Sequence, residues 1–105
     1  MVRTISLAFV ALLGGCVTSY QGIERRDVVA TYHTARPRAA LATCLVEGLS
    51  RQGAPLIVER DGNTVVSFNY EGSTNLLITL TPAGDVLVRR SQPGQIYRSG
   101  VERCL

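Results

Sequence analysis

The chain has 105 residues, with eleven Lys or Arg and eight Asp or Glu, and its formal net charge is +3 at pH 7. This length predicts one folded domain. Binding to nucleic acid is not expected, because the cations form no basic run interleaved with aromatic side chains. The sequence also has no phosphate-loop or dinucleotide glycine motif, so no cofactor is predicted.

The N-terminal segment follows the pattern of a bacterial secretory signal. Arg3 precedes an apolar run over residues 4–13, and two glycines then lead to Cys16. A membrane-spanning helix needs about 20 apolar residues, and this run is shorter. A segment of this kind is a processing signal and not part of the fold. We therefore expect residues 1–15 to be removed as a signal peptide.

The stretch Leu13-Gly14-Gly15-Cys16 resembles the lipobox of bacterial lipoproteins, which the lipoprotein signal peptidase cuts just before the cysteine. The leucine and the small residue before the cysteine match that family, whereas Gly14 departs from its commoner Ala, Ser, Thr or Val. The resemblance implies that Cys16 carries a thioether-linked diacylglycerol and, in many bacteria, a further acyl chain such as palmitate. Val17 is not Asp, so the enterobacterial sorting rule implies an anchor on the periplasmic face of the outer membrane.

This resemblance divides the chain into three parts. Residues 1–15 form the signal peptide, residues 16–33 hold the lipidated Cys16 and a tether, and residues 34–105 form a single α+β domain. The tether is expected because residues 17–26 are polar and follow no sustained hydrophobic period. Residues 27–33 carry enough apolar side chains for a short strand, which stays open as an alternative.

Two cysteines remain in the mature chain, Cys44 and Cys104. Thiols tend to pair in the oxidising periplasm, and two cysteines allow one internal pairing, so a Cys44–Cys104 disulfide is predicted. The chain-entropy relation gives such a bridge about 4 kcal/mol of stabilisation. Two buried free thiols are the alternative. No metal site is predicted, because two isolated cysteines and the lone His33 lack ligand spacing.

Residues 34–52 are predicted to form the main helix. Small or apolar residues at positions 41, 44, 45, 48 and 49 recur with helical spacing and form one stripe. Thr34 is expected to cap this helix, Pro37 lies in its first turn, and Gly53 is expected to end it. Cys44 belongs to the apolar stripe, which suits a structural bond.

Beyond Gly53 the hydrophobic period changes to two, which indicates short strands. Strands are predicted over residues 55–59, 64–70, 76–81 and 86–90, with tight turns or loops between them. Val66, Phe68 and Tyr70 are expected to face the core. Residues 95–105 fit a short helix or a last strand, and the helix is favoured. The predicted fold class is α+β, with one main helix packed on a four-stranded antiparallel meander and a short C-terminal helix.

Candidate functional residues are few. A patch for an anionic ligand is one hypothesis, and a solvated rim is its alternative; the patch would consist of Arg89, Arg90, Arg98 and Arg103. His33 is the only histidine, and no Gly-flanked serine accompanies it in the mature chain. Asp61 and Asp85 lie in predicted turns, where Asp commonly bonds its own backbone. No catalytic residue is therefore predicted.

The expected function is that of a non-enzymatic lipoprotein that binds an envelope protein as an accessory or scaffold. The alternative is a small inhibitor or exclusion factor against a periplasmic hydrolase or a surface receptor, and an enzyme is a third hypothesis. An uncovered sheet face with Val65, Leu77 and Leu87 would favour the first. A protruding loop over residues 71–75 would favour the second, and a deep pocket at His33 beside a carboxylate the third. The oligomeric state stays open.

Overall fold

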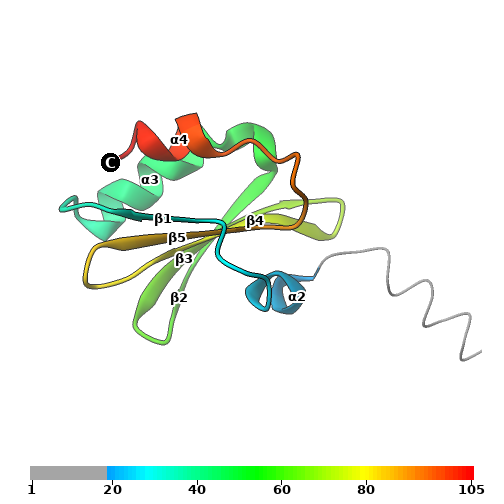
Figure 1. Ribbon diagram of the computed structural model, residues 1–105, viewed down its shortest axis with the longest axis horizontal. Helices are drawn as coiled ribbons and strands as arrows, with labels where there is room; N and C mark the ends of the chain where they lie inside the picture. The colour runs from blue at the N-terminus through cyan, green and yellow to red at the C-terminus, as the bar shows by residue number, and fades with distance from the viewer. Residues whose placement is uncertain (1–18) are drawn as a thin grey trace, which may run out of the picture.

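The computed structural model describes residues 19–105, and these form an α+β fold around one antiparallel sheet (Figure 1). Its elements in chain order are α2 (Tyr20–Glu24), β1 (Ala30–His33), α3 (Arg38–Gly48), the 3-10 helix η1 (Ser50–Gln52), β2 (Ala54–Arg60), β3 (Asn63–Tyr70), β4 (Ser73–Leu80), β5 (Asp85–Arg90) and α4 (Arg98–Glu102). The five strands lie in the order β1-β5-β4-β3-β2. The predicted signal peptide and Cys16 lie outside the described residues.

The sheet contains the predicted meander and one strand more. β2, β3, β4 and β5 pair in sequence, as hairpin-spaced strands do, and β1 adds to the free side of β5. The favoured C-terminal helix is present as α4, and the main helix is present as α3 followed by η1. The four-strand prediction was therefore one short, because β1 is brief and its partner lies more than fifty residues further along the chain.

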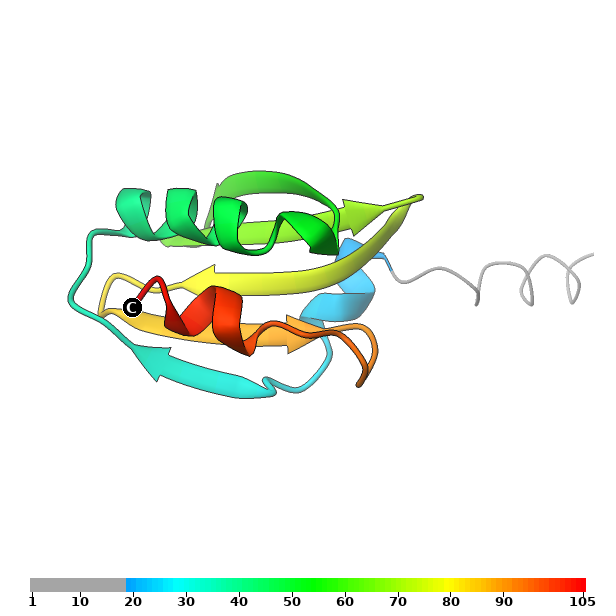
Figure 2. The same ribbon diagram turned by 90° about the horizontal axis from the view of Figure 1, so that it is seen from above.

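One face of the sheet carries the main core. α3 and α4 lie side by side over this face (Figure 2), and strand alternation sends Val66 and Phe68 of β3 beneath them. Fourteen buried residues form this cluster, among them Leu45 of α3 and Val101 of α4, both fully buried. Burial of this apolar surface is the main favourable term in folding.

α3 begins later than predicted. The helix begins at Arg38 with Pro37 as its N-cap residue, and Thr34 does not cap it. The Thr34 hydroxyl instead accepts from the Arg36 amide at 3.2 Å and donates to the Leu105 carbonyl at 3.1 Å. Thr34 therefore joins the chain before α3 to the C-terminus.

Two tight hairpins fix the register of the meander. Asp61 and Gly62 both have positive φ angles, as do Glu71 and Gly72, and two such residues make a type I′ turn. The second turn is shorter than the loop predicted over residues 71–75, because β4 begins at Ser73.

A register shift between Phe68 and Asn69 interrupts the alternation of β3. Tyr70, predicted to face the core, is instead 63% exposed.

The opposite face of the sheet is covered in part by α2, below the strands in Figure 1. Ser19 caps this helix by accepting from the Gly22 amide at 3.0 Å. Ile23 is fully buried and packs on Val65 and Leu77. α2 and β1 therefore belong to the fold, although residues 16–33 were predicted to hold a tether.

Candidate functional site

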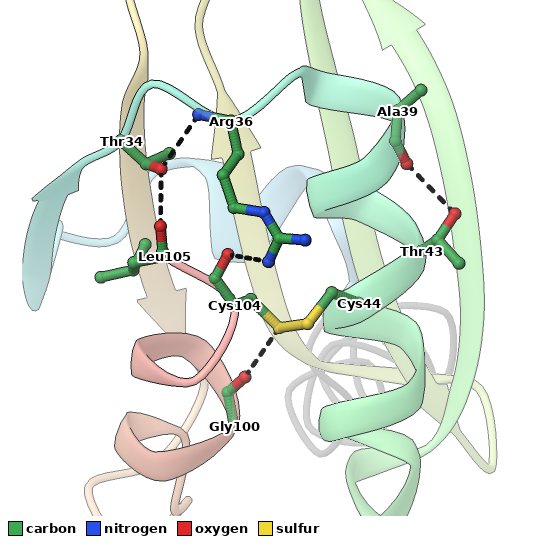
Figure 3. The surroundings of a disulfide bond; sticks show 8 residues. All are labelled: Thr34, Arg36, Ala39, Thr43, Cys44, Gly100, Cys104 and Leu105. Atoms are coloured by element: carbon green, nitrogen blue, oxygen red, sulfur yellow. Dashed lines mark hydrogen bonds between the residues drawn. A yellow bond between two sulfur atoms is a disulfide. The ribbon is translucent and has the colours of Figure 1, made fainter.

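The predicted Cys44–Cys104 disulfide is present and joins α3 to the end of α4 (Figure 3). The two Cα atoms are 5.7 Å apart and the sequence separation is 60. One helical turn away, a Cβ on Gly100 would come within 2.8 Å of the Gly48 carbonyl oxygen, so the helices touch where neither has a side chain. α3 and α4 therefore run antiparallel. The cysteine pair is structural, because the disulfide joins these two helices.

Two further contacts hold the C-terminus against the segment before α3. Arg36 Nη1 donates to the Cys104 carbonyl at 2.7 Å, next to the Thr34–Leu105 bond (Figure 3). Hydrogen bonds from a charged donor are stronger than neutral ones. The disulfide and these bonds make the helix-covered side of the molecule its most heavily cross-linked part.

His33 has a carboxylate partner that sequence reasoning missed. Its Nδ1 lies 3.1 Å from Asp85 Oδ1, because β1 and β5 place the two residues opposite one another. The His33 and Asp85 side chains are 71% and 44% exposed, and His33 lines a hollow of about 480 Å³. Two threonine hydroxyls line that hollow, and both are engaged elsewhere: Thr34 bonds Leu105, and Thr81 accepts from the Asp85 amide. The pair lacks the activated nucleophile and the dry site that triad chemistry requires.

The four arginines of the predicted anionic patch do not share one surface. Arg89 lies on the α2 face, where its Nε donates to a carbonyl of the α2–β1 connection at 3.1 Å. Arg90 points to the other face, since successive strand residues alternate, and its guanidinium carbon lies 5.7 Å from the Tyr97 ring centroid. Arg98 shares a hollow with Arg90, whereas Arg103 lines a separate one between α3 and α4.

A different set of arginines lines one hollow. Arg25 and Arg26 of the α2–β1 connection and Arg90 at the end of β5 line one hollow of about 370 Å³, together with Asp27. We call it the basic hollow. Arg25 and Arg26 lay in the predicted tether, and no sequence signal placed them beside Arg90. Only the pairing of β1 with β5 brings the two connections together.

β2 forms an open edge of the sheet. Its seven residues pair with β3 on one side, and β2 is the last strand in the sheet order. In a two-residue hairpin the closing pair, here Arg60 and Asn63, is hydrogen-bonded, and bonded pairs then alternate along an antiparallel ladder. Pro55, Ile57 and Glu59 therefore direct their backbone groups away from β3. We call this outward side of β2 the β2 edge.

The β2 edge is apolar on both faces of the sheet, and side-chain hydrogen bonds hold its turn end. Leu56 is 51% exposed on the α2 side and Ile57 is 48% exposed on the helix side. Arg38, at the start of α3, donates to the Gly62 carbonyl at 2.8 Å and ties down the hairpin turn. Glu59 accepts from the Thr64 hydroxyl at 2.6 Å. A long edge strand with apolar side chains and free backbone groups is a ready template for another strand.

The uncovered apolar face expected for a partner-binding protein is mostly closed. α2 buries Val65 and Leu77 on that face, and Leu87 is half-buried.

Within residues 19–105, no helix combines the length and apolar character that crossing a membrane requires. The same part of the chain holds no group of three or more His, Cys, Asp or Glu placed to share a metal ion.

Comparison of the chain with models of protein families, with curated proteins and with solved structures gives no match.

Proposed function

We propose that this protein is a lipid-anchored lipoprotein on the periplasmic face of the outer membrane, and that it holds an envelope protein at the β2 edge without catalysing a reaction. The partner contributes an extended segment that pairs with β2 as an additional strand. Main-chain hydrogen bonds supply affinity in this mode of recognition, and side chains on the two faces supply specificity.

The anchor is supported by the lipobox, and the first helix follows it closely. Val17 and Thr18 alone separate Cys16 from Ser19, the N-cap of α2. Three residues span at most about 10 Å. Acyl chains on Cys16 would therefore hold α2 close to the lipid headgroups, and two such chains suffice for stable attachment.

The β2 edge is the observation that carries the binding proposal. Outward N–H groups at Ile57 and Glu59 and outward carbonyls at Pro55, Ile57 and Glu59 offer a partner strand a ladder. Leu56 and Ile57 would lose their exposed apolar surface to the same partner. Natural edge strands are usually blunted by charge, bulges or covering elements. In β2, only Pro55 and the charged residues next to the turn, Glu59 and Arg60, serve that purpose.

A second copy of the chain is a poorer occupant of the β2 edge than a different protein. In the antiparallel pairing that places Ile57 opposite Ile57, Pro55 of each copy faces Glu59 of the other. Proline has no N–H, so each Glu59 carbonyl loses its donor. Shifting the register to place Glu59 opposite Glu59 sets like charges against each other, which destabilises a sheet pair. A foreign strand carries neither restriction.

The two other hypotheses have less support. Inhibitors reach into a partner's cleft with a protruding loop, but residues 71–72 form a tight turn and Ser73 already belongs to β4. An enzyme is disfavoured by the exposed His33–Asp85 pair, whose neighbouring hydroxyls are engaged elsewhere. Partner binding needs only the rigid, open edge that is present.

The test uses the full chain in its own envelope, with a photo-crosslinking amino acid at position 57 or at the exposed control position 51. Crosslinking at 57 and not at 51, to a protein of different mass, is expected. Ile57→Lys should weaken that complex about ten-fold, because about 1.5 kcal/mol of apolar burial is lost. A crosslink only to a second copy, or equal capture at 57 and 51, would refute strand addition.

Cys16→Ser tests the anchor separately. This variant should lose the lipid label, and the protein should no longer be recovered with the membrane fraction.

A further inference from the structure

We propose that the basic hollow binds a phosphate group presented at the membrane surface, and that it thereby orients the anchored domain. This inference rests on the proposed anchoring at Cys16 for the orientation, but the binding chemistry depends only on residues 25–27 and 90–93. It assigns a ligand class to Arg25, Arg26 and Arg90, which lie outside the β2 edge.

The hollow is built from two connections that are fixed to one another. The Val29 amide donates to the Val88 carbonyl at 2.8 Å, and Arg89 Nε donates to the Arg26 carbonyl at 3.1 Å. These bonds hold the chain after α2 against the end of β5. On the other wall, Gln95 Oε1 accepts from the Ser91 amide at 3.0 Å and so shapes the turn that follows β5. The arginines are therefore placed by a defined backbone.

The charge of the hollow favours an anion. Three arginines and one acidic residue, Asp27, line it. Neither Arg25 nor Arg26 makes a salt bridge within residues 19–105, whereas Arg60 nearby is paired with Glu24 at 3.0 Å. Arg90 is oriented by its contact with the Tyr97 ring. A guanidinium presents several donors in one plane, which matches the oxygens of a phosphate better than an ammonium does.

The position of the hollow points to a lipid headgroup as the source of the phosphate. α2 has five residues and is about 8 Å long. With the span of about 10 Å from Cys16 to Ser19, the hollow lies within about 20 Å of the acyl attachment. Basic residues close to an anionic surface each contribute about a five-fold gain in binding. Soluble phosphate has the same chemistry and is the alternative source.

The test uses the full chain carrying Cys16→Ser, so that acylation cannot hold it to vesicles. We measure the ratio of partitioning into phosphatidylglycerol-containing vesicles to that into phosphatidylcholine vesicles, which cancels the contribution of the apolar N-terminal run. Arg25→Gln and Arg26→Gln should each lower this ratio about five-fold. Arg51→Gln removes the same charge from η1, which does not line the basic hollow, and should leave the ratio unchanged. Thermal unfolding checks that each variant is folded.

A second arm titrates inorganic phosphate and follows the arginine Nε–Hε resonances. A vesicle ratio that falls in Arg25→Gln assigns the site to a headgroup. Saturable phosphate shifts that vanish in Arg25→Gln, without a vesicle preference, assign it to soluble phosphate. An equal fall of the ratio in Arg51→Gln, or the absence of both effects, would overturn the proposal. The lipid label on Cys16 is scored independently, so a failed anchor and a failed hollow are distinguishable.

Discussion

The two faces of the sheet differ in how they are closed. The helix face is covered by α3 and α4, which a disulfide joins, over a cluster of fourteen buried residues. The α2 face is covered by a helix of five residues that buries Ile23 against Val65 and Leu77. On this second face the Tyr20 hydroxyl is buried without a hydrogen-bond partner. The first face holds the fold together, and the second is lightly attached.

This difference agrees with the two proposed sites, the β2 edge for a partner protein and the basic hollow for the membrane surface. A helix as short as α2 is not stable by itself, so its order depends on packing against the sheet. The basic hollow adjoins this lightly attached helix, and the lipid anchor would precede it. The β2 edge is held by a complete hairpin and by Arg38 from α3. In our proposal, the partner strand would pair at the edge held by the hairpin and Arg38, while the membrane would lie on the side of α2.

The largest effect is expected from removing the disulfide. The double variant Cys44→Ala, Cys104→Ala should lose about 4 kcal/mol of unfolding free energy, because the unfolded chain regains the freedom of a long closed loop. Small domains have about 5–15 kcal/mol in total, so this is a large share. Urea unfolding measures the loss, and hydrogen exchange should show α4 opening before the strands.

The single variants provide the control for this prediction. Cys44→Ala and Cys104→Ala should each lose nearly as much as the double variant, since either one removes the bond. A double variant that unfolds at the same urea concentration as the wild type would contradict the structural role of the bridge. In the wild type, faster exchange in α4 than in α2 would mean that the α2 face, and not the helix face, is the more firmly attached one.

A smaller effect is expected on the other face. Ile23→Ala leaves a cavity between α2 and the sheet and should cost about 2 kcal/mol, at the low end for buried aliphatic truncations, because α2 can separate without opening the main core. Leu45→Ala, equally buried under α3, should cost about 4 kcal/mol. Urea unfolding compares the two. Equal losses would show that both faces are closed with the same strength.

The sequence predicted the helix face better than the α2 face. Helical spacing from position 41 to position 49 identified the side of α3 that packs on the sheet, and alternation identified Val66 and Phe68 beneath it. The disulfide was predicted from the oxidising periplasm and from the presence of two cysteines in the mature chain. The helical spacing and the strand alternation are local signals, because each depends on residues that are close together in the chain. Thr34 was the exception, because its hydroxyl binds the chain end, more than seventy positions away.

The misses share a cause. α2 has one fully buried residue, Ile23, and contains a glycine, so it has no hydrophobic period to detect. β1 has four residues and is fixed only by pairing with β5, which also creates the His33–Asp85 contact and the basic hollow. Tyr70 lies beyond a register shift that alternation cannot anticipate. Long-range contacts determined each of these features. The apolar side chains of residues 27–33 allowed a short strand there, but a single sequence contains no local signal for its pairing with β5.

The smallest effect concerns the rim of the helix face at alkaline pH. Burial, and then the nearby Glu102 carboxylate, raise the pKa of Tyr32 above its usual 10.0. The folded state therefore holds this proton more tightly than the unfolded state does. The resulting stability is complete below pH 10.0 and is lost as the pH rises through that value towards the folded pKa. Tyr32→Phe should make the alkaline decline of unfolding free energy shallower than in the wild type.

Urea unfolding at neutral pH and at several pH values above 10.0 measures this decline. Glu102→Gln is the matched variant, because it removes the smaller of the two causes and leaves the tyrosine in place. Its decline should fall between those of the wild type and Tyr32→Phe. If Glu102→Gln gave the same decline as Tyr32→Phe, the carboxylate on α4 would dominate over burial. Deprotonation of Tyr32 would then act by repelling α4 from β1, and the helix face would have its own weak point at this rim.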